Sequence, residues 1–303
     1  MVKLFFLLLL ILINVNVATA QPSMKNTETL KSDIELLFDA TPGTFALAFK
    51  DLSAADHQLL INEREAFHAA STMKTPVMIE VYRQAAAGRF SLQDSLLVKN
   101  EFKSIVDGSP YSMEIGRDDG EHLYDNIGKK RSVKELVVDM IIYSSNLATN
   151  IVIELVGADE VNKTMRSLGA NDIQVLRGVE DMKAYDAGLN NSTTAYDLMR
   201  IFEALAREEV VSKKDSQEMV EILLQQTHKD VIPVLLPAAV KVANKTGFIS
   251  GVHHDSAIVY LPDGRKYVLV LLSKQLQDAE AGKKMLSQVS RLVYDHMMKK
   301  HSY

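Results

Sequence analysis

The spacing of apolar residues changes along the chain, from strand-like at both ends to helix-like in the middle. An apolar face that includes Leu30 and Ile34 predicts a helix over 25–39, and a similar face predicts a final helix over 279–300. Alternating apolar positions predict strands over 44–50, 58–62, 240–246, 255–261 and 266–272. Helical periodicity predicts helices over 72–87, 132–144, 146–156, 158–168, 193–209 and 214–227.

Strands that are separated from helices in this way indicate an α+β fold. We expect an antiparallel sheet, built from both ends of the chain and flanked by the terminal helices. An all-helical lobe over about 76–229 would be inserted between the halves of this sheet, and a ligand site is expected where lobe and sheet meet. The segment 100–131 is rich in Gly, Asp and Ser, and irregular excursions of this length are usually functional or mobile.

The first twenty residues have the pattern of a secretory signal. Lys3 gives a positive start, residues 4–13 are all apolar, and 18–20 read Ala-Thr-Ala. The apolar run is too short to span a bilayer comfortably, so a cleaved signal is favoured over an uncleaved anchor. We expect cleavage near Ala20, export to the periplasm or the medium without a stable membrane anchor, and a single catalytic domain over 21–303.

Composition narrows the function classes. The 303 residues are 47% hydrophobic and 24% charged, which is typical of a soluble globular protein. The formal net charge is -5 and there is no long basic run, which argues against nucleic acid as a partner. The chain has no cysteine, so disulfides, lipid attachment at a cysteine and thiol catalysis are excluded. We expect a monomer that acts on a small molecule without cofactor or metal.

Ser71 and Lys74 form the only S-x-x-K motif of the chain, at the predicted start of a helix. Positions three apart share a helix face, which would place the lysine amine beside the hydroxyl. An amine with a lowered pKa can accept the hydroxyl proton, and the helix N-terminus favours the developing negative charge. Taken alone, the motif favours a capping serine followed by a surface lysine.

Ser144 and Asn146 lie at the junction of two predicted helices. There a hydroxyl could relay a proton and an amide could bind a substrate carbonyl, although both residue types are also common helix caps.

Lys245, Thr246 and Gly247 lie on a predicted strand near the C-terminus. A lysine and a hydroxyl at this place suit a substrate carboxylate, and the glycine permits close approach of the backbone. The next N–H group, from Phe248, can serve as an oxyanion donor. The alternative is an edge-strand lysine beside a bulge glycine.

Together and in this order, the S-x-x-K, S-x-N and K-T-G motifs resemble those of class A β-lactamases and penicillin-binding proteins. The segment 143–150, which reads Tyr-Ser-Ser-Asn-Leu-Ala-Thr-Asn, is similar to the same family, and the similarity extends over roughly 44–274. Segments 177–181 and 187–191 resemble a broader group of class A-related serine hydrolases. The resemblance implies the β-lactamase/transpeptidase-like fold and hydrolysis of β-lactams through an acyl-enzyme.

The resemblance also implies a role for each matched residue. Ser71 would be the nucleophile and Lys74 its proton acceptor, while Ser144 would exchange a proton with Lys245.

Substrate binding would fall to the remaining matched positions. Asn146 would hold the substrate amide, Thr246 would contact its carboxylate, and the N–H groups of Ser71 and Phe248 would form the oxyanion hole.

The residue that would activate water for deacylation departs from the family pattern. The family usually has a glutamate two residues after an arginine, with Leu-Asn soon after, whereas here Glu180 follows Arg177 by three and Leu-Asn stands at 189–190. Glu180 is our candidate for the catalytic base, and a solvated loop carboxylate beside Arg177 is the alternative.

Three further departures bear on the substrate rather than on the fold. Ser145 replaces an aspartate of the family whose role looks structural, and Phe248 is bulky where the family tends to have a small residue. The family has a basic residue on the strand that follows the K-T-G motif, and this chain has no arginine at that place. His254 is nearest in register, and we expect it to be a core or turn histidine.

Three other functions compete with that of a β-lactamase. The same nucleophile could serve a peptidoglycan carboxypeptidase or an esterase-like hydrolase. A non-catalytic protein that binds penicillin or cell-wall fragments would not need the matched nucleophile and base. A metallo-hydrolase would depend on His253, His254 and Asp255, but adjacent strand residues point to opposite faces and no H-x-H-x-D or H-E-x-x-H pattern is present.

Overall fold

The computed structural model describes residues 22–54 and 57–299. The predicted signal, with its cleavage site near Ala20, lies outside the described residues.

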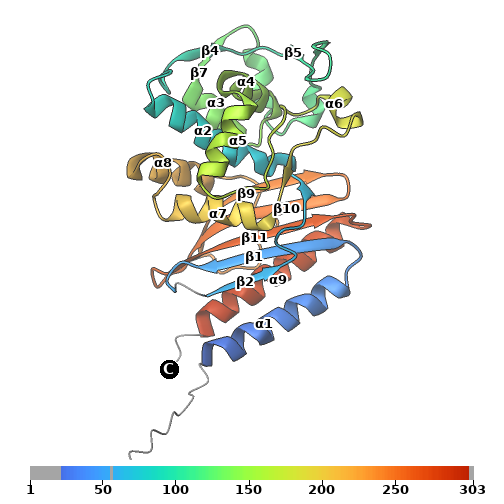
Figure 1. Cartoon of the computed structure of the whole chain (residues 1–303), viewed down its shortest axis with the longest axis vertical. Coiled ribbons are helices and arrows are strands. Elements are labelled where there is room, and N and C mark those ends of the chain that lie inside the picture. The colour runs from blue at the N-terminus through green and yellow to red at the C-terminus, as the bar shows by residue number, and fades with distance from the viewer. Residues whose placement is uncertain (1–21, 55–56, 300–303) are drawn as a thin grey trace, which may run out of the picture.

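A five-stranded antiparallel sheet, in the order β2-β1-β11-β10-β9, forms the middle layer (Figure 1). Its strands come from both ends of the chain, as predicted. They are β1 (Thr44–Asp51), β2 (Gln58–Ile61), β9 (Lys241–Ile249), β10 (Val252–Tyr260) and β11 (Lys266–Lys274).

The β9–β10 hairpin is longer than the apolar pattern predicted. His253 pairs with Phe248 and His254 pairs with Gly247, so both strands continue up to a tight turn at Gly251. Histidines and a glycine interrupt the apolar alternation here, so the prediction ended the first strand too early, at 246, and began the second strand too late, at 255. The extension brings the whole K-T-G motif and Phe248 into a regular edge strand.

Each face of the sheet belongs to a different hydrophobic core. Leu47 and Leu271 pack with the terminal helices α1 (Pro22–Asp39) and α9 (Ala279–Lys299), which lie side by side below the sheet in Figure 1. Ala46 and Val270, one residue away on each strand, join the core of the helical lobe. This alternation follows from the two-residue period of a strand that is covered on both faces.

The helical lobe is inserted between β1–β2 and β9, above the sheet in Figure 1. Its helices are α2 (Lys74–Ala86), α3 (Val133–Ile142), α4 (Asn146–Val156), α5 (Ala158–Ser167), α6 (Met182–Asp186), α7 (Ala195–Ala206) and α8 (Lys213–Leu224). The short helix α6 was not predicted from the sequence. Two short strand pairs flank the lobe: β3 (Phe67–His68) with β8 (Ser192–Thr193), and β4 (Ser95–Leu97) with β7 (Lys130–Ser132).

The segment 100–131 wraps over the lobe without a long regular element. It contains the strand pair β5 (Phe102–Lys103) and β6 (Pro110–Tyr111), then the 3-10 turns η2 (Ile115–Arg117) and η3 (Glu121–Asn126). η2 and η3 bring its second half to the start of α4, where the predicted S-x-N motif lies.

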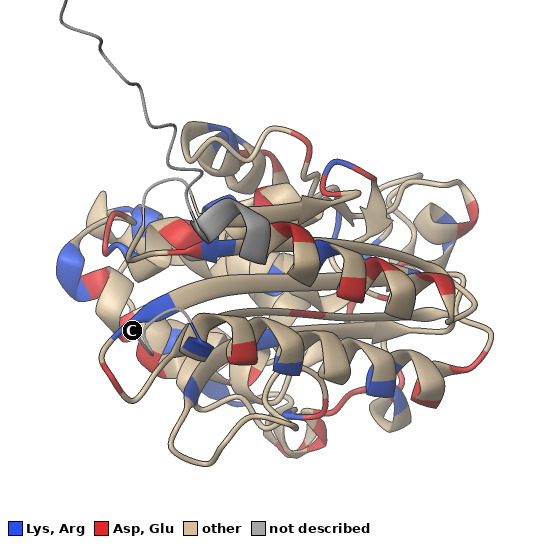
Figure 2. Cartoon of the chain, turned by 90° about the horizontal axis from the view of Figure 1, so that it is seen from below, with Lys and Arg blue, Asp and Glu red and all other residues tan. Residues whose placement is uncertain are grey.

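Charges of both signs are spread over the two terminal helices, as Figure 2 shows from below. Among residues 22–54 and 57–299, none of the helices has the length and apolar character that crossing a membrane requires.

Candidate active site

Ser71 lies in a 3-10 turn, η1 (Ala70–Met73), which leads directly into α2. Ala70 precedes it with a φ of 45°, a left-handed conformation that costs a non-glycine residue about 1–3 kcal/mol. Ser71 is partly exposed, and its hydroxyl makes no hydrogen bond with another residue in the described part of the chain. The chain therefore presents Ser71 at the N-terminus of a 13-residue helix, where the helix dipole favours negative charge.

Lys74 is fully buried, and within the described residues its ammonium group makes its hydrogen bonds at the α3–α4 junction. Its Nζ donates to the Ser144 carbonyl at 2.6 Å, to Ser144 Oγ at 3.2 Å and to Asn146 Oδ1 at 2.9 Å. The placement of Lys74 beside Ser71 stays a prediction, and the three acceptors at this helix junction fix the position of the ammonium group. Burial lowers the pKa of Lys74 to about 8, against the opposing charge of Asp118.

Ser144 connects the two lysines. It lies between α3 and α4 with a φ of 57°, and its Oγ accepts from Nζ of Lys74 at 3.2 Å and from Nζ of Lys245 at 3.0 Å. With two ammonium donors, the hydroxyl hydrogen of Ser144 is free to point into the cleft. The predicted S-x-x-K, S-x-N and K-T-G motifs are thus brought together around one serine.

Lys245 is fully buried on β9, and burial lowers its pKa well below the usual range, helped by the nearby charge of Lys74. Two residues further along the strand, a Cβ on Gly247 would lie 2.9 Å from the Ser71 backbone nitrogen. Glycine is therefore required where β9 passes the nucleophile. Because β9 is the edge strand beside η1, this end of the strand can offer backbone groups to a ligand on Ser71.

Asn146 bridges Lys74 and Glu180 from the first turn of α4. Its Oδ1 accepts from Lys74, and its Nδ2 donates to Glu180 Oε1 at 2.9 Å. Glu180 also has a positive φ, of 61°. Burial raises its pKa, partly offset by the Asn146 hydrogen bond. A cavity of about 440 Å³ is lined by Ser71, Asn146 and Glu180, together with Phe248.

Two anchors fix the loop that carries Glu180. The Arg177 guanidinium donates to the Leu189 carbonyl at 2.9 Å and to Asn190 Oδ1 at 2.8 Å, which closes the loop at its base. The Asn150 amide pairs with both backbone groups of Val179, just before Glu180. A Cβ on the preceding residue, Gly178, would lie 2.3 Å from Asn150 Oδ1, so only glycine allows this approach.

Several residues around this cavity have strained backbone conformations. Of the seven non-glycine residues that have a positive φ in the described parts of the chain, three are Ala70, Ser144 and Glu180. Such conformations persist only where the surrounding structure enforces them, and they are concentrated at functional sites.

Comparison with known proteins agrees with the geometry. A family model described as "Beta-lactamase enzyme family" matches residues 29–297. The chain belongs to the β-lactamase enzyme family.

Individual proteins resemble the chain over most of its length. A β-lactamase of Bacillus licheniformis is 27% identical over 90% of this chain and 86% of its own. The β-lactamase structure from Sphaerobacter thermophilus DSM 20745 has 25% identity and a TM-score of 0.75, over 89% of this chain and 98% of that one. The structure of PBP-A has 26% identity and a TM-score of 0.76, over 89% of this chain and 96% of that one. The predicted family and the β-lactamase/transpeptidase-like fold are confirmed.

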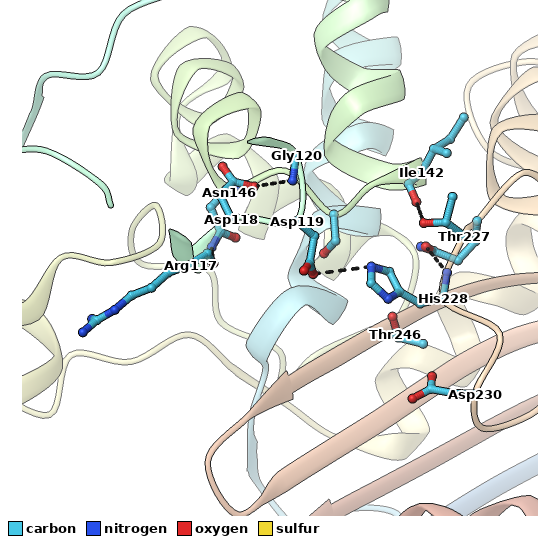
Figure 3. Close-up of polar contacts among 12 residues, drawn as sticks. Arg117, Asp118, Asp119, Gly120, Ile142, Asn146, Thr227, His228, Asp230 and Thr246 are labelled. Carbon is cyan, nitrogen blue, oxygen red and sulfur yellow. Dashed lines mark hydrogen bonds and ion pairs between the residues drawn. The ribbon is translucent and has the colours of Figure 1, made fainter. Parts of the chain in front are cut away.

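Ser145, which stands where the family has an aspartate, donates to the carboxylate of Asp118, a contact that the sequence did not reveal. Asp118 is buried, and its carboxylate accepts from the backbone N–H groups of Asn146 at 2.9 Å and Leu147 at 2.8 Å, and from Ser145 Oγ at 3.3 Å. It thereby caps α4 from the segment 100–131 (Figure 3). The only available signal was that this segment is long and irregular.

Two other departures from the family, at His254 and Phe248, are described by their surroundings. His254 is a core histidine, as expected: it is fully buried, its Nε2 lies 2.9 Å from the His68 carbonyl oxygen, and burial lowers its pKa to about 4. Phe248 is half exposed at the cleft, with its ring stacked on that of His253 at 5.9 Å.

His253, His254 and Asp255 do not form a ligand set. Asp255 accepts from the Asn244 amide and the Ile232 backbone, away from the Phe248–His253 stack. Within the described part of the chain, no three His, Cys, Asp or Glu side chains are grouped as a metal ion would require.

Proposed function

We propose that the protein is a class A-like serine β-lactamase that hydrolyses β-lactams through an acyl-enzyme on Ser71. The observation that carries this proposal is that one cavity is lined by a partly exposed serine and by a carboxylate, and that two buried lysines meet beside it. A non-catalytic binding protein gains nothing from burying Lys74 and Lys245 together, because each buried ammonium group is costly.

In acylation, Lys74 in its neutral form takes the proton of Ser71 while the hydroxyl oxygen attacks the lactam carbonyl. The N–H groups of Ser71 and Phe248 stabilise the oxyanion, with Gly247 keeping β9 close enough. Ser144 passes a proton to the leaving nitrogen and regains one from Lys245. Asn146 holds the amide of the substrate, and Thr246 faces its carboxylate. In deacylation, Glu180 activates the water that cleaves the ester.

The proposal also includes where the protein acts and how its chain is organised. The N-terminal pattern that ends at Ala20 supports export, to the periplasm or the medium, as a catalytic domain over 21–303. We further propose that the protein is a monomer, and the cavity of about 440 Å³ beside Ser71 supports a small-molecule substrate.

A single incubation distinguishes this function from its alternatives. Mature protein mixed with a chromogenic cephalosporin should release the chromophore over many turnovers, and an intact mass taken early should show the acyl adduct. A stable adduct without turnover would favour a carboxypeptidase or another acyl donor. The absence of both signals would contradict the proposed function.

The pH dependence of acylation tests Lys74 as the base. A base must be deprotonated to act, and the pKa of Lys74 is lowered to about 8. The acylation rate at limiting substrate should therefore rise about tenfold per pH unit between pH 6 and 7, and level off above about pH 8. Lys74→Arg should abolish this rise, because a guanidinium stays protonated throughout. A flat profile for the wild type would contradict the assignment.

A further inference from the structure

His68 lies in the wall of the cavity that holds Ser71, shortly before the nucleophile in the chain. It ends the strand β3, and its Nδ1 accepts a hydrogen bond from the backbone N–H of Ala70 at 3.0 Å. A backbone N–H can only donate, so Nδ1 carries no proton and the proton of the neutral ring is on Nε2. The His68 side chain is thus bonded to the strained residue that precedes Ser71.

The surroundings of the His68 ring keep it a neutral acceptor. Burial lowers the pKa of His68, the charge of Arg177 lowers it further, and a hydrogen bond with the Asn190 side chain opposes both effects. Asn190 Oδ1 also accepts from the Arg177 guanidinium at 2.8 Å, at the base of the loop that carries Glu180. At neutral pH the lone pair of Nδ1 therefore stays available to the Ala70 N–H.

The backbone of His68 is fixed as well. Its carbonyl oxygen lies 2.9 Å from Nε2 of the fully buried His254, which donates because Nδ1 of that ring accepts from the Ser273 N–H at 3.1 Å. On the β8 side, His68 pairs with Ser192. His68 is therefore held by two neighbouring strands and can fix the turn that follows it.

The N–H groups of Ala70 and Ser71 belong to successive peptides that meet at the Ala70 Cα. With a φ of 45° at Ala70, fixing the first N–H also restricts the direction of the second. Such a conformation persists only where its surroundings enforce it, and the bond to His68 is one of these constraints. β9 passes so close to the Ser71 nitrogen that only glycine fits at Gly247, so a small rotation here would change how the two backbones meet.

We propose that His68 is a positioning residue for the oxyanion hole: by accepting from Ala70, it directs the Ser71 N–H toward the negative charge that develops on the substrate. This inference rests on the proposed acylation of Ser71. Removing one donor from an oxyanion hole costs about 100- to 1,000-fold in rate. A donor that is misdirected rather than removed should cost less, and we expect a loss of about 10- to 100-fold without the His68 acceptor.

Two matched variants separate the acceptor from the rest of the side chain. In His68→Asn the amide oxygen can take the place of Nδ1, whereas in His68→Gln the amide reaches the place of Nε2 and leaves the Ala70 N–H without its acceptor. Phenylboronic acid is the probe, because it forms a tetrahedral anion on a serine oxygen that resembles the transition state of acylation. Measured by calorimetry, the affinity of His68→Gln for this probe should fall about 10- to 100-fold, and that of His68→Asn should stay within about threefold of the wild type.

Acylation by benzylpenicillin, followed by intact mass at several concentrations, gives the matching kinetic measurement. The maximal acylation rate of His68→Gln should fall by a similar factor, while the concentration for half-maximal rate changes little, because the oxyanion hole acts in the transition state. A merely structural role would instead lower the melting temperature and the fraction of protein that is labelled, with the rate per labelled molecule unchanged.

Equal probe affinities in the two folded variants, whether high or low, would overturn the inference. A loss of about tenfold or more in folded His68→Asn would overturn it even if His68→Gln did not fold. A wild type that binds the probe on Ser71 but is not labelled by β-lactams would overturn the proposed function alone, and the probe would still decide the role of His68. A wild type that does neither would overturn both.

Discussion

Replacing Ser71 with alanine should abolish both turnover of a β-lactam and its covalent attachment to the protein, while the fold survives. Removing the nucleophile of a serine hydrolase costs on the order of 10⁵- to 10⁶-fold in rate, because no other group can form the acyl-enzyme. The cost in stability should be small, since the Ser71 hydroxyl is partly exposed and makes no hydrogen bond within the described residues.

Intact mass after incubation with benzylpenicillin or its methyl ester, together with a thermal melt, checks both parts of this prediction. Ser95→Ala, at an exposed serine on β4, is the matched control and should label and melt like the wild type. Peptide mapping guards against a substitute nucleophile. A stoichiometric adduct on Thr72 or Ser144 in the Ser71→Ala protein would contradict the assignment.

Those parts of the fold that depend on local pattern could be predicted from the sequence. The apolar residues of β1 and β11 are buried on both faces of the sheet, and the terminal helices have one apolar face each. The S-x-x-K, S-x-N and K-T-G motifs were found because each is short and lies within or beside a regular element. Their meeting at Ser144 required only that the helical lobe be inserted between the halves of the sheet.

The parts that depend on contacts between distant loops could not be predicted. Asp118 and Asp119 lie in a segment without periodicity, and their partners, Asn146 and His228, are 28 and 109 positions further along the chain (146 − 118 and 228 − 119). The position of Glu180 also depends on contacts between distant segments and could not be predicted. Its altered spacing from Arg177 left its position open until the Asn150 contacts and the positive φ placed its carboxylate against Asn146.

Replacing Glu180 with glutamine should leave acylation largely intact and make the acyl-enzyme accumulate. The substitution keeps the shape of the side chain, and the glutamine carbonyl can still accept the Asn146 hydrogen bond. What it removes is the ability to take a proton from water, and loss of a general base costs about 100- to 10,000-fold. The raised pKa of Glu180 fits this role, since a carboxylate that binds protons more tightly is a stronger base.

Single-turnover mass spectrometry of wild type and Glu180→Gln measures the lifetime of the adduct directly. Glu101→Gln, at an exposed carboxylate of the segment 100–131, controls for the loss of one negative charge and should keep the wild-type lifetime. The pH dependence provides an independent check. Wild-type deacylation should slow as the pH falls through the raised pKa of Glu180, because protonation removes the base, and the glutamine variant should lack this acid limb. Equal adduct lifetimes in the two proteins would exclude Glu180 from deacylation, yet leave Ser71 and Lys74 as the acylating pair.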